Sequence, residues 1–346
     1  MFLPGLVVTL SALPIAAPPA PAYVLETADA QRVEATLTYS VRCDKLKAKE
    51  WLVIVAQAPE LPGQVKVESR LEPGGAPAKD LSPLKRPLLA ARVPVKQREL
   101  ETGIPIQVTY KATLRSRQLK PLATGAAVPK VEPLGDKERE AALAALGEID
   151  HKSDAVQAWL REHKLRREKE ESDLEFARRV FTALRTGYRY EYRAGMDRHA
   201  SAVCKAERSD CGGLSGLFVA ALRANGVPSR TLYGRWAKSA EAGEKLGGVH
   251  YFQGHVKAEF FADGVGWVPV DVASGLRQDG SKDGLAFFGH DRGDFLTFHV
   301  DPSLELETRV FGRKSVNCLQ CPAYWATGPG STEGTTVKEG WEVKKQ

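Results

Sequence analysis

The sequence lacks the long, uniform stretches that would assign it to a special class of protein. After the N-terminal segment no apolar run reaches the roughly 20 residues that a membrane-spanning helix needs. No dense run of Lys and Arg with interleaved aromatic residues occurs, so the pattern typical of a nucleic-acid-binding surface is missing. Cys318 and Cys321 have no second pair of zinc ligands to accompany them. We therefore expect no stable membrane insertion, no nucleic-acid partner, no metal and no cofactor.

The composition is that of an ordinary globular protein. The 346 residues are 43% apolar and 27% charged, and 49 basic against 43 acidic residues give a formal net charge of +6. This length has room for two domains. The basic excess is small and spread along the chain, so it indicates only a mild attraction to acidic surfaces. The oligomeric state is left open.

The first 22 residues are predicted to be a signal peptide for export. Leu3 to Ala17 is a short apolar run, and Ala20-Pro21-Ala22 fits the small-x-small pattern before a cleavage site. Two features depart from the usual pattern, because no basic residue precedes Arg32 and two prolines interrupt the apolar run. A disordered N-terminus is the alternative. The expected product is a soluble protein that is secreted or periplasmic.

Cysteine is present in an odd number, with five residues at positions 43, 204, 211, 318 and 321. At least one thiol stays unpaired if the others form bridges, and Cys211 is the one we expect to be free. Cys318-Leu-Gln-Cys321 has redox-motif spacing, but the helical pattern that normally follows such a motif is absent. A structural pair, bridged or reduced, is the preferred interpretation. A disulfide oxidoreductase is an alternative, and Cys43 or Cys204 could also pair.

Residues 23–118 are predicted to form a small antiparallel β-sandwich. The segments 33–41 and 104–114 alternate apolar and polar residues, and 51–56 is a buried apolar run, with Gly, Pro and Asp clusters between them. No residue here suggests chemistry, so we expect a packing or substrate-presenting role. Residues 119–135, which contain three prolines, are the predicted linker to a second domain.

From residue 136 the hydrophobic period becomes helical, and residues 136–300 are the predicted catalytic domain. Asp136 and Ser153 can each begin a helix, and Ser172-Asp-Leu-Glu175 matches a capping box that begins a third. Residues 301–346 are expected to hold one or more C-terminal strands and a flexible tail, because the segment after Gly328 is rich in Gly, Ser and Thr.

Two aromatic residues are candidates for contact with substrate. Tyr188-Arg-Tyr-Glu-Tyr192 alternates like a strand and would place three phenols on one side, either as a packed aromatic ladder or, less often, lining a substrate site. Tyr190 is the candidate from this segment, and Trp267 is the second.

Cys211 is placed by its surroundings at the start of a helix. Asp210 can cap it, apolar residues recur at helical spacing to Leu222, and Asn225-Gly226 ends it. A helix N-terminus favours a thiolate, lowering a thiol pKa from about 8.5 toward neutrality or below. Its unpaired N–H groups could also hold an oxyanion. Gly212 and Gly213 lack side chains that would obstruct an approaching substrate.

A β-meander follows the helix and supplies a histidine and a carboxylate. Strands are predicted at 230–236, 250–261 and 266–272, with a hairpin tip at 262–264. If Phe261 and Val265 flank that tip, His255 and Asp271 lie directly opposite each other, with Cβ atoms about 4.5 to 5.5 Å apart. The carboxylate would then orient the imidazole, as a Cys–His–Asp unit requires.

Four other histidines compete for the role of base. His250 has the opposite strand parity to His255 and should face the other side of the sheet. His199 is the better rival, in a loop near Cys211, but it has no obvious carboxylate partner. His290 and His299 follow the core. Solvated surface positions are the expected role of these residues.

Three blocks of sequence resemble the core of the transglutaminase-like superfamily over roughly residues 170–300. They are Asp-Cys-Gly-Gly-Leu-Ser-Gly-Leu-Phe at 210–218, His-Val-Lys-Ala-Glu at 255–259 and Gly-Trp-Val-Pro-Val-Asp at 266–271. The resemblance implies an α+β, papain-like fold in which N-terminal helices pack on an antiparallel sheet.

By the same resemblance Cys211 is the nucleophile, His255 the base and acid, and Asp271 the orienter. Where the family often has Ala-Trp after the histidine, this chain has Val256-Lys257, which puts the substrate subsite and the rate in question. The superfamily includes transglutaminases, proteases, amidases and non-catalytic members, so the fold does not choose a reaction. We expect a cysteine acyl-transfer enzyme that acts on peptide or protein amides, with hydrolysis favoured over Gln–Lys transamidation. A non-catalytic peptide-binding module is the alternative.

Overall fold

The computed structural model describes residues 23–96, 99, 103–123, 125–127, 129–246, 249–250 and 253–346, without the side chains of 246, 249 and 250. The predicted signal peptide lies outside the described residues. Within the described part of the chain, no helix is long and apolar enough to cross a bilayer.

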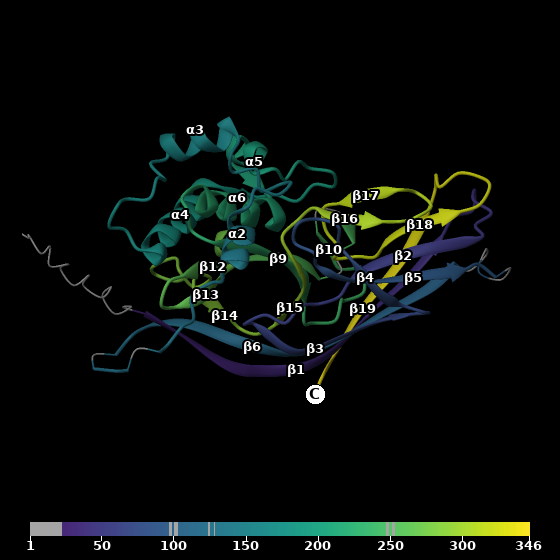
Figure 1. Ribbon diagram of the computed structural model, residues 1–346, viewed down its shortest axis with the longest axis horizontal. Helices are drawn as coiled ribbons and strands as arrows, with labels where there is room; N and C mark the ends of the chain where they lie inside the picture. The colour runs from purple at the N-terminus through teal and green to yellow at the C-terminus, as the bar shows by residue number, and fades with distance from the viewer. Residues whose placement is uncertain are drawn as a thin grey trace, which may run out of the picture.

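The chain is a mixed α/β protein with mostly antiparallel sheets (Figure 1). Its elements in chain order are β1 (Tyr23–Arg42), β2 (Glu50–Ala56), β3 (Gln64–Glu72), β4 (Ala76–Lys79), β5 (Pro87–Pro94), β6 (Ile104–Pro121), α2 (Asp136–Leu143), α3 (Asp154–Glu162), α4 (Asp173–Gly187), β7 (Arg189–Tyr190), α5 (Ala200–Ala206), β8 (Arg208–Ser209), α6 (Cys211–Ala224), β9 (Ser229–Trp236), β10 (Lys245–Leu246), β11 (Val249–His250), β12 (Gly254–Ala262), β13 (Gly266–Val270), α7 (Val272–Gln278), β14 (His290–Asp291), β15 (Phe295–Val300), β16 (Leu304–Glu307), β17 (Arg313–Val316), β18 (Ala323–Thr327) and β19 (Thr336–Lys345).

The N-terminal strands form a β-sandwich, as their alternating sequence predicts. One sheet has the order β14-β6-β1-β19, with β3 also paired to β6, and the other has the order β18-β2-β5-β4. Side chains of period two point into the core between the sheets, for example Leu37 and Val41 of β1 and Val108 of β6. The buried run in β2 contributes Val53 and Val55 to the same core.

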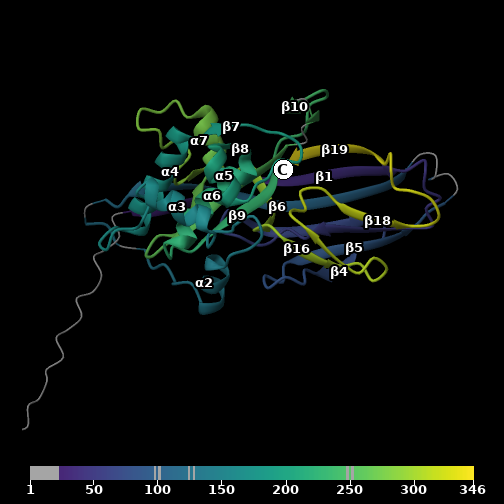
Figure 2. The same ribbon diagram turned by 90° about the horizontal axis from the view of Figure 1, so that it is seen from above.

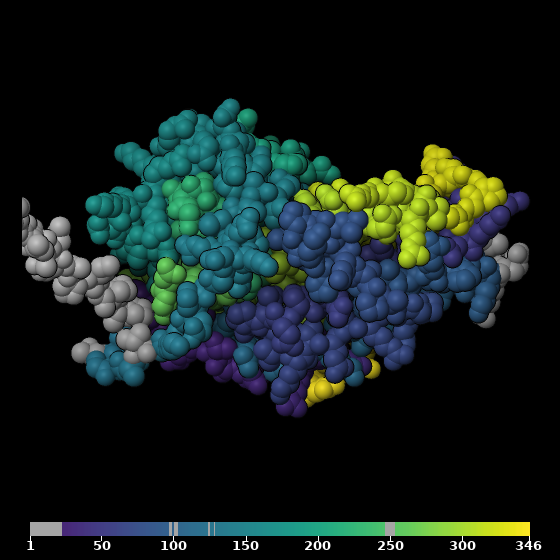
Figure 3. Space-filling model, viewed as in Figure 1, coloured from purple at the N-terminus to yellow at the C-terminus, as the bar shows by residue number. Residues whose placement is uncertain are grey.

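The C-terminal segment completes this sandwich, so the expectation of a flexible tail is wrong. β19 pairs with β1 over ten residues, with Leu37 opposite Trp341, and Trp341 is 3% exposed. β18 pairs with β2 in the other sheet. Figure 3 shows these C-terminal residues, in yellow, lying against the N-terminal strands. A Gly- and Thr-rich composition favours disorder only when no partner strand is available, and β1 supplies one.

The second unit, which the sequence predicts to be the catalytic domain, packs helices on a four-stranded sheet of order β13-β12-β9-β15. Its core is formed by the helices α3 to α6 and by one face of β12 and β13, and it includes Phe181, Phe218 and Phe260. The predicted caps are confirmed. The Ser153 side chain accepts a hydrogen bond from the N–H of Val156, and Ser172 forms the full capping box with Glu175. α2 ends at Leu143, and its N-cap residue is Gly135 rather than Asp136. The expected α+β fold is confirmed.

A long ribbon of β1 and β6 joins the two units. The strands pair from Tyr23 and Pro121 at one end to Val41 and Ile104 at the other. They run beneath the helices and continue as two strands of one sheet of the sandwich (Figure 1 and Figure 2). The first part of β1 contacts the helical core, and β14 of the catalytic unit adds to the edge of β6. β6 extends to Pro121, beyond the predicted start of the linker at residue 119.

Candidate active site

Cys211 is the first residue of α6, as its sequence context predicts. The Asp210 side chain caps the helix by accepting from the N–H groups of Gly212 and Gly213, at 3.1 and 3.2 Å. A second interaction fixes that cap, because the Arg198 guanidinium holds both carboxylate oxygens of Asp210, at 3.0 Å from Nε and 2.6 Å from Nη2. The nucleophile candidate is therefore held at a rigid, charge-neutralised helix start.

His255 lies between Cys211 and Asp271. Its Nε2 is 2.8 Å from Oδ2 of Asp271, and its ring lies close enough to Cys211 for the thiol to help raise the pKa of the imidazole. Since Nε2 faces the carboxylate, Nδ1 is the ring nitrogen that remains for the sulfur. All three predicted catalytic residues are thus brought together in the order that acyl transfer requires.

The register that produces this contact differs from the prediction. The last hairpin pair is Ala262 with Gly266, so both flanks of the tip lie one residue further along than expected. When this register is continued, Lys257, not His255, lies opposite position 271. A displacement of two residues preserves the sheet face, and so the histidine and the aspartate still meet diagonally. Asp271 has also left the strand and caps α7, where it accepts from the N–H of Ser274 at 2.9 Å.

The ionisation of the pair follows from burial and mutual charge. Burial by itself would lower the pKa of His255, but the charge and hydrogen bond of Asp271 and the contact with Cys211 raise it to about 9. Burial would raise the pKa of Asp271, and the opposing charge and hydrogen bond of His255 lower it to about 2. At neutral pH the site therefore contains an imidazolium and a carboxylate, and the imidazolium stabilises negative charge on the adjacent sulfur.

The donors expected to hold an oxyanion are only partly available. The N–H groups of Gly212 and Gly213 are bound to Asp210. Among the described residues, the N–H of Cys211 has no hydrogen-bond partner, so it is the helix-start donor that remains for a developing oxyanion.

Two cavities adjoin the His255 imidazole and share Tyr190 and Gly254. The first, of about 290 Å³, contains Cys211 and Gly212 together with Glu148 and Arg198. We call it the sulfur cavity. The second, of about 700 Å³, contains His255 and Asp271, and it is lined by basic residues from several elements. We call it the basic cleft.

Of the predicted substrate contacts, Tyr190 and Gly212 line the sulfur cavity, whereas Gly213 and Trp267 do not. A Cβ on Gly213 would come within 2.1 Å of the Ser209 hydroxyl, so this glycine serves close packing rather than access. Trp267 packs with Phe261 and under the Arg230 guanidinium, 3.8 Å from its ring centre. It shares a sheet face with His255 but lies at the far end of the hairpin and lines neither cavity, so the structure does not bring it to the candidate site.

Two of the four rival histidines, His199 and His299, are engaged with other partners. His199 does have a carboxylate partner, Asp197, at 2.7 Å, and it lies outside the sulfur cavity. His299 is not a surface residue as expected, since it stacks on Tyr233 at 4.9 Å and burial, the largest cause, lowers its pKa to about 3. His290 is exposed and lines the basic cleft. The side chain of His250 lies outside the described residues.

All five cysteines lie in the described part of the chain, and all five are free thiols. Cys318 and Cys321 line the sulfur cavity, a proximity that their sequence distance from Cys211 gave no reason to expect. Burial raises the pKa of Cys318 and raises that of Cys321 to about 12. A redox-active thiol needs a lowered pKa, so these values disfavour the oxidoreductase alternative.

Sequence reasoning missed several residues that support His255. Trp236 stacks on the imidazole at 4.6 Å, with 20° between the ring planes. Gln320 donates to the His255 carbonyl at 2.7 Å. Lys257, where relatives often have Trp, places Nζ 4.6 Å from the Trp236 ring centre and 3.3 Å from Oδ2 of Asp291. Only Lys257 had a sequence signal, because it departs from the family pattern beside the histidine.

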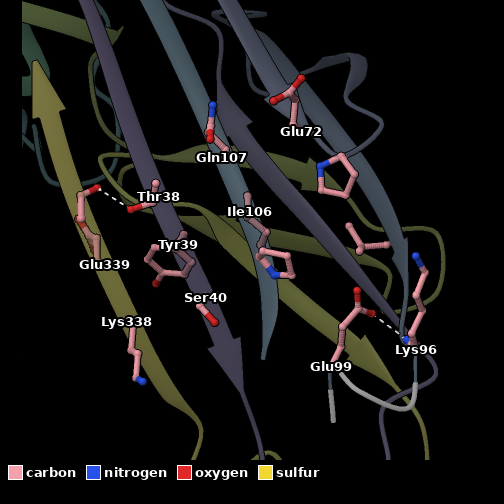
Figure 4. Close-up of a pocket in the computed structure, with 14 residues that line it drawn as sticks. Thr38, Tyr39, Ser40, Glu72, Lys96, Glu99, Ile106, Gln107, Lys338 and Glu339 are labelled. Atoms are coloured by element: carbon pink, nitrogen blue, oxygen red, sulfur yellow. Dashed lines mark hydrogen bonds between the residues drawn. The ribbon is translucent and has the colours of Figure 1, made fainter. Parts of the chain in front are cut away.

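A third cavity, of about 640 Å³, lies on the β-sandwich (Figure 4). Its lining comes from β1, β6 and β19 and neighbouring segments, and includes Tyr39, Glu72 and Lys338. The residues that line it include neither a cysteine nor a histidine, so it offers no nucleophile or imidazole base for acyl transfer.

A family model described as the transglutaminase-like superfamily matches residues 162–272, a span that contains Cys211, His255 and Asp271. The chain is also 33% identical over 78 residues to an uncharacterized protein of Haemophilus influenzae. That match covers 19% of this chain and 21% of the relative, so it spans only about a fifth of the relative's length. The resemblance inferred from the three sequence blocks is confirmed.

A solved structure with a similar fold supports the architecture. The chain is similar to a candidate cysteine protease from Cytophaga hutchinsonii, with a TM-score of 0.53 at 9% identity, covering 93% of this chain and 100% of that one. The periplasmic domain of TgpA from Pseudomonas aeruginosa matches with a TM-score of 0.35 at 13% identity, over 69% of this chain and 87% of that domain. The lower TM-score of the TgpA match is too small to assign any feature of that domain to this chain.

Proposed function

Starting from a chain whose residues 162–272 form a transglutaminase-like domain, we propose that the protein is a cysteine acyl-transfer enzyme acting on peptide or protein amides. The observation that carries the proposal is the position of His255, whose Nε2 lies 2.8 Å from Asp271 and whose ring adjoins Cys211. An isolated structural histidine would need neither a thiol nor a buried carboxylate as its partner.

The reaction follows from this geometry. The Cys211 thiolate attacks the amide carbonyl carbon, and the oxyanion forms beside the helix start. The C–N bond then breaks, the departing nitrogen takes a proton from the His255 imidazolium, and the acyl group stays on sulfur as a thioester. Asp271 holds the ring in place and stabilises its charge. Water, activated by His255, then attacks the thioester and releases the acid.

Hydrolysis is the proposed outcome rather than transfer to an amine. Water is abundant at both cavities, whereas transfer to a lysine needs an acceptor channel that excludes it. We also propose that the protein works outside the cytoplasm, on the strength of the N-terminal signal-like segment.

The reactivity of Cys211 is the first test. At pH 6 the imidazolium beside it should make iodoacetamide label Cys211 much faster than the buried Cys204, whose pKa burial raises. A Cys211→Ala variant should have no turnover. Equal, slow labelling of both thiols would instead support a non-catalytic peptide-binding module.

A second test separates hydrolysis from transfer. A library of Gln-containing peptides is incubated with the enzyme and a labelled primary amine, and both products are read by mass spectrometry. Shorter or deamidated peptides without label support hydrolysis. Labelled peptides that disappear in the Cys211→Ala variant would show that the enzyme is a transamidase.

A further inference from the structure

The basic cleft adjoins the catalytic imidazole on the side of Asp271. It contains His255 and Asp271 but not Cys211, and it meets the sulfur cavity at Tyr190 and Gly254. Its charged lining consists of five cations and three carboxylates, namely Lys238, Lys257, Arg277, Arg292, Lys345, Asp271, Asp291 and Asp294.

The carboxylates of the cleft are neutralised from within. Asp271 is bound to His255. Asp291 is shared between Lys257 at 3.3 Å and Arg117 at 3.7 Å, and Asp294 lies 3.7 Å from Lys257. Because each of these carboxylates is paired with a cation of the protein, together they add little net negative charge to the cleft.

Three of the cations have no acidic partner within the described residues. They are Arg277 of α7, Arg292 after β14 and Lys345 of β19, and all three are exposed. Arg277 lies over the Tyr190 ring, 4.7 Å from its centre, and so sits where the two cavities meet. Three cations converging from separate elements on one cavity of about 700 Å³ favour an anionic ligand.

The sulfur cavity has no such excess. Its Arg198 is bound to Asp210, and its Arg235 is paired with Glu339. It also contains Glu148, a buried carboxylate that accepts from Asn317 at 3.0 Å. An acidic group is therefore disfavoured on the side of the sulfur and favoured on the side of the imidazole.

We propose that the basic cleft binds the amine side of the substrate, and that this side carries carboxylates, as an acidic peptide segment does. The assignment to the amine side rests on the proposed function, because His255 must protonate the departing nitrogen and so the amine component leaves from the imidazole. The acyl component stays with Cys211 in the sulfur cavity.

Binding can be measured without turnover in the Cys211→Ala protein. Fluorescein-labelled hexapeptides that differ only in three consecutive Glu, Gln or Lys residues are titrated by fluorescence anisotropy. The Glu peptide should bind at least about tenfold more tightly than the Gln peptide, since each exposed charge pair contributes a factor of about five. This preference should vanish when Arg277→Glu and Arg292→Glu are added.

Arg313→Glu with Lys314→Glu is the matched control. This double variant changes the net charge by the same amount. Both substituted residues lie on β17, are exposed, and line neither the sulfur cavity nor the basic cleft. The control should keep the preference for the Glu peptide. Equal binding of all three peptides, or equal loss in both double variants, would overturn the proposal.

Measurements of turnover then show on which side of the cleaved bond the acidic residues bind. With Cys211 intact, peptides that carry Glu on the amine side of the cleaved bond should have the higher kcat/KM, and the Arg277→Glu, Arg292→Glu variant should lose this advantage through KM with little change in kcat. A preference for Glu on the acyl side would refute the assignment. If no peptide is turned over, the proposed function fails, while the anisotropy result still decides whether the cleft binds anions.

Discussion

Two helices of the catalytic unit begin with a buried aspartate, and the two aspartates differ only in their partner. Asp210 caps α6 and is held by Arg198, whereas Asp271 caps α7 and is bound to His255. An arginine stays charged at every accessible pH, but a histidine can release its proton. The same local motif therefore gives a fixed ion pair at one helix start and a titratable one at the other.

The difference also sets what each pair can contribute. A permanent ion pair at the start of α6 fixes the position of Cys211 but cannot move a proton. The pair at the start of α7 can, because the imidazole changes its charge during the reaction while Asp271 remains ionised. The first motif has a structural role and the second the proposed catalytic one, and substitutions should separate them.

Asp271→Asn should have the largest effect on activity. The amide can still cap α7, but it removes the charge that raises the pKa of His255 and holds the ring, so kcat/KM should fall on the order of 10³-fold or more. The free energy of unfolding near neutral pH should also fall, because the raised pKa of His255 means that the ion pair stabilises the folded state there. Steady-state kinetics and urea unfolding test the two halves, and retention of most activity would contradict the assigned role.

Asp210→Asn should lower stability without a comparable loss of activity. The cap can again be kept, but Arg198 cannot release its charge and is left without its carboxylate, so the free energy of unfolding should fall by about 1.5–3 kcal/mol. Activity should fall far less than in Asp271→Asn. Urea denaturation measures the loss, and a larger effect on kcat than on stability would show that the two caps are not as different as their partners indicate.

The pH dependence of stability should also separate the pairs. Because the folded pKa of His255 is raised, its contribution is fully present below the unfolded value of about 6.5 and is lost as pH rises through about 9. The free energy of unfolding of the parent protein should therefore decline across this window. The decline should be smaller in Asp271→Asn and unchanged in Asp210→Asn, with unfolding measured in urea at a series of pH values.

Lys257→Met should have the smallest effect. Lys257 supports the catalytic pair indirectly, since its charge helps to lower the pKa of Asp271 and its Nζ lies over Trp236, which stacks on His255. We expect kcat to fall about three- to tenfold with KM little changed, because a buried cation–π contact is worth roughly 1–2 kcal/mol. Lys257→Arg should recover most of the rate, whereas equal losses in both variants would indicate a packing role.

Local patterns in the sequence determined much of this site. The cap at Asp210, the capping box at Ser172 and the strand alternation depend on residues a few positions apart, so their spacing is visible in one dimension. The sheet face shared by His255 and Asp271 survived an error in register because side-chain direction repeats every two residues. The Cys–His–Asp set and the α+β fold followed from these patterns.

What joins distant segments was decided only by the tertiary structure. Trp341 lies opposite Leu37, Gln320 holds the His255 carbonyl, and Arg198 reaches Asp210 across a helix and a loop. No short-range pattern encodes such contacts, since they depend on how two units pack around the β1–β6 ribbon. The sequence by itself therefore determined which residues can react, and the packing of the chain decided which partners hold them and which charges surround the substrate.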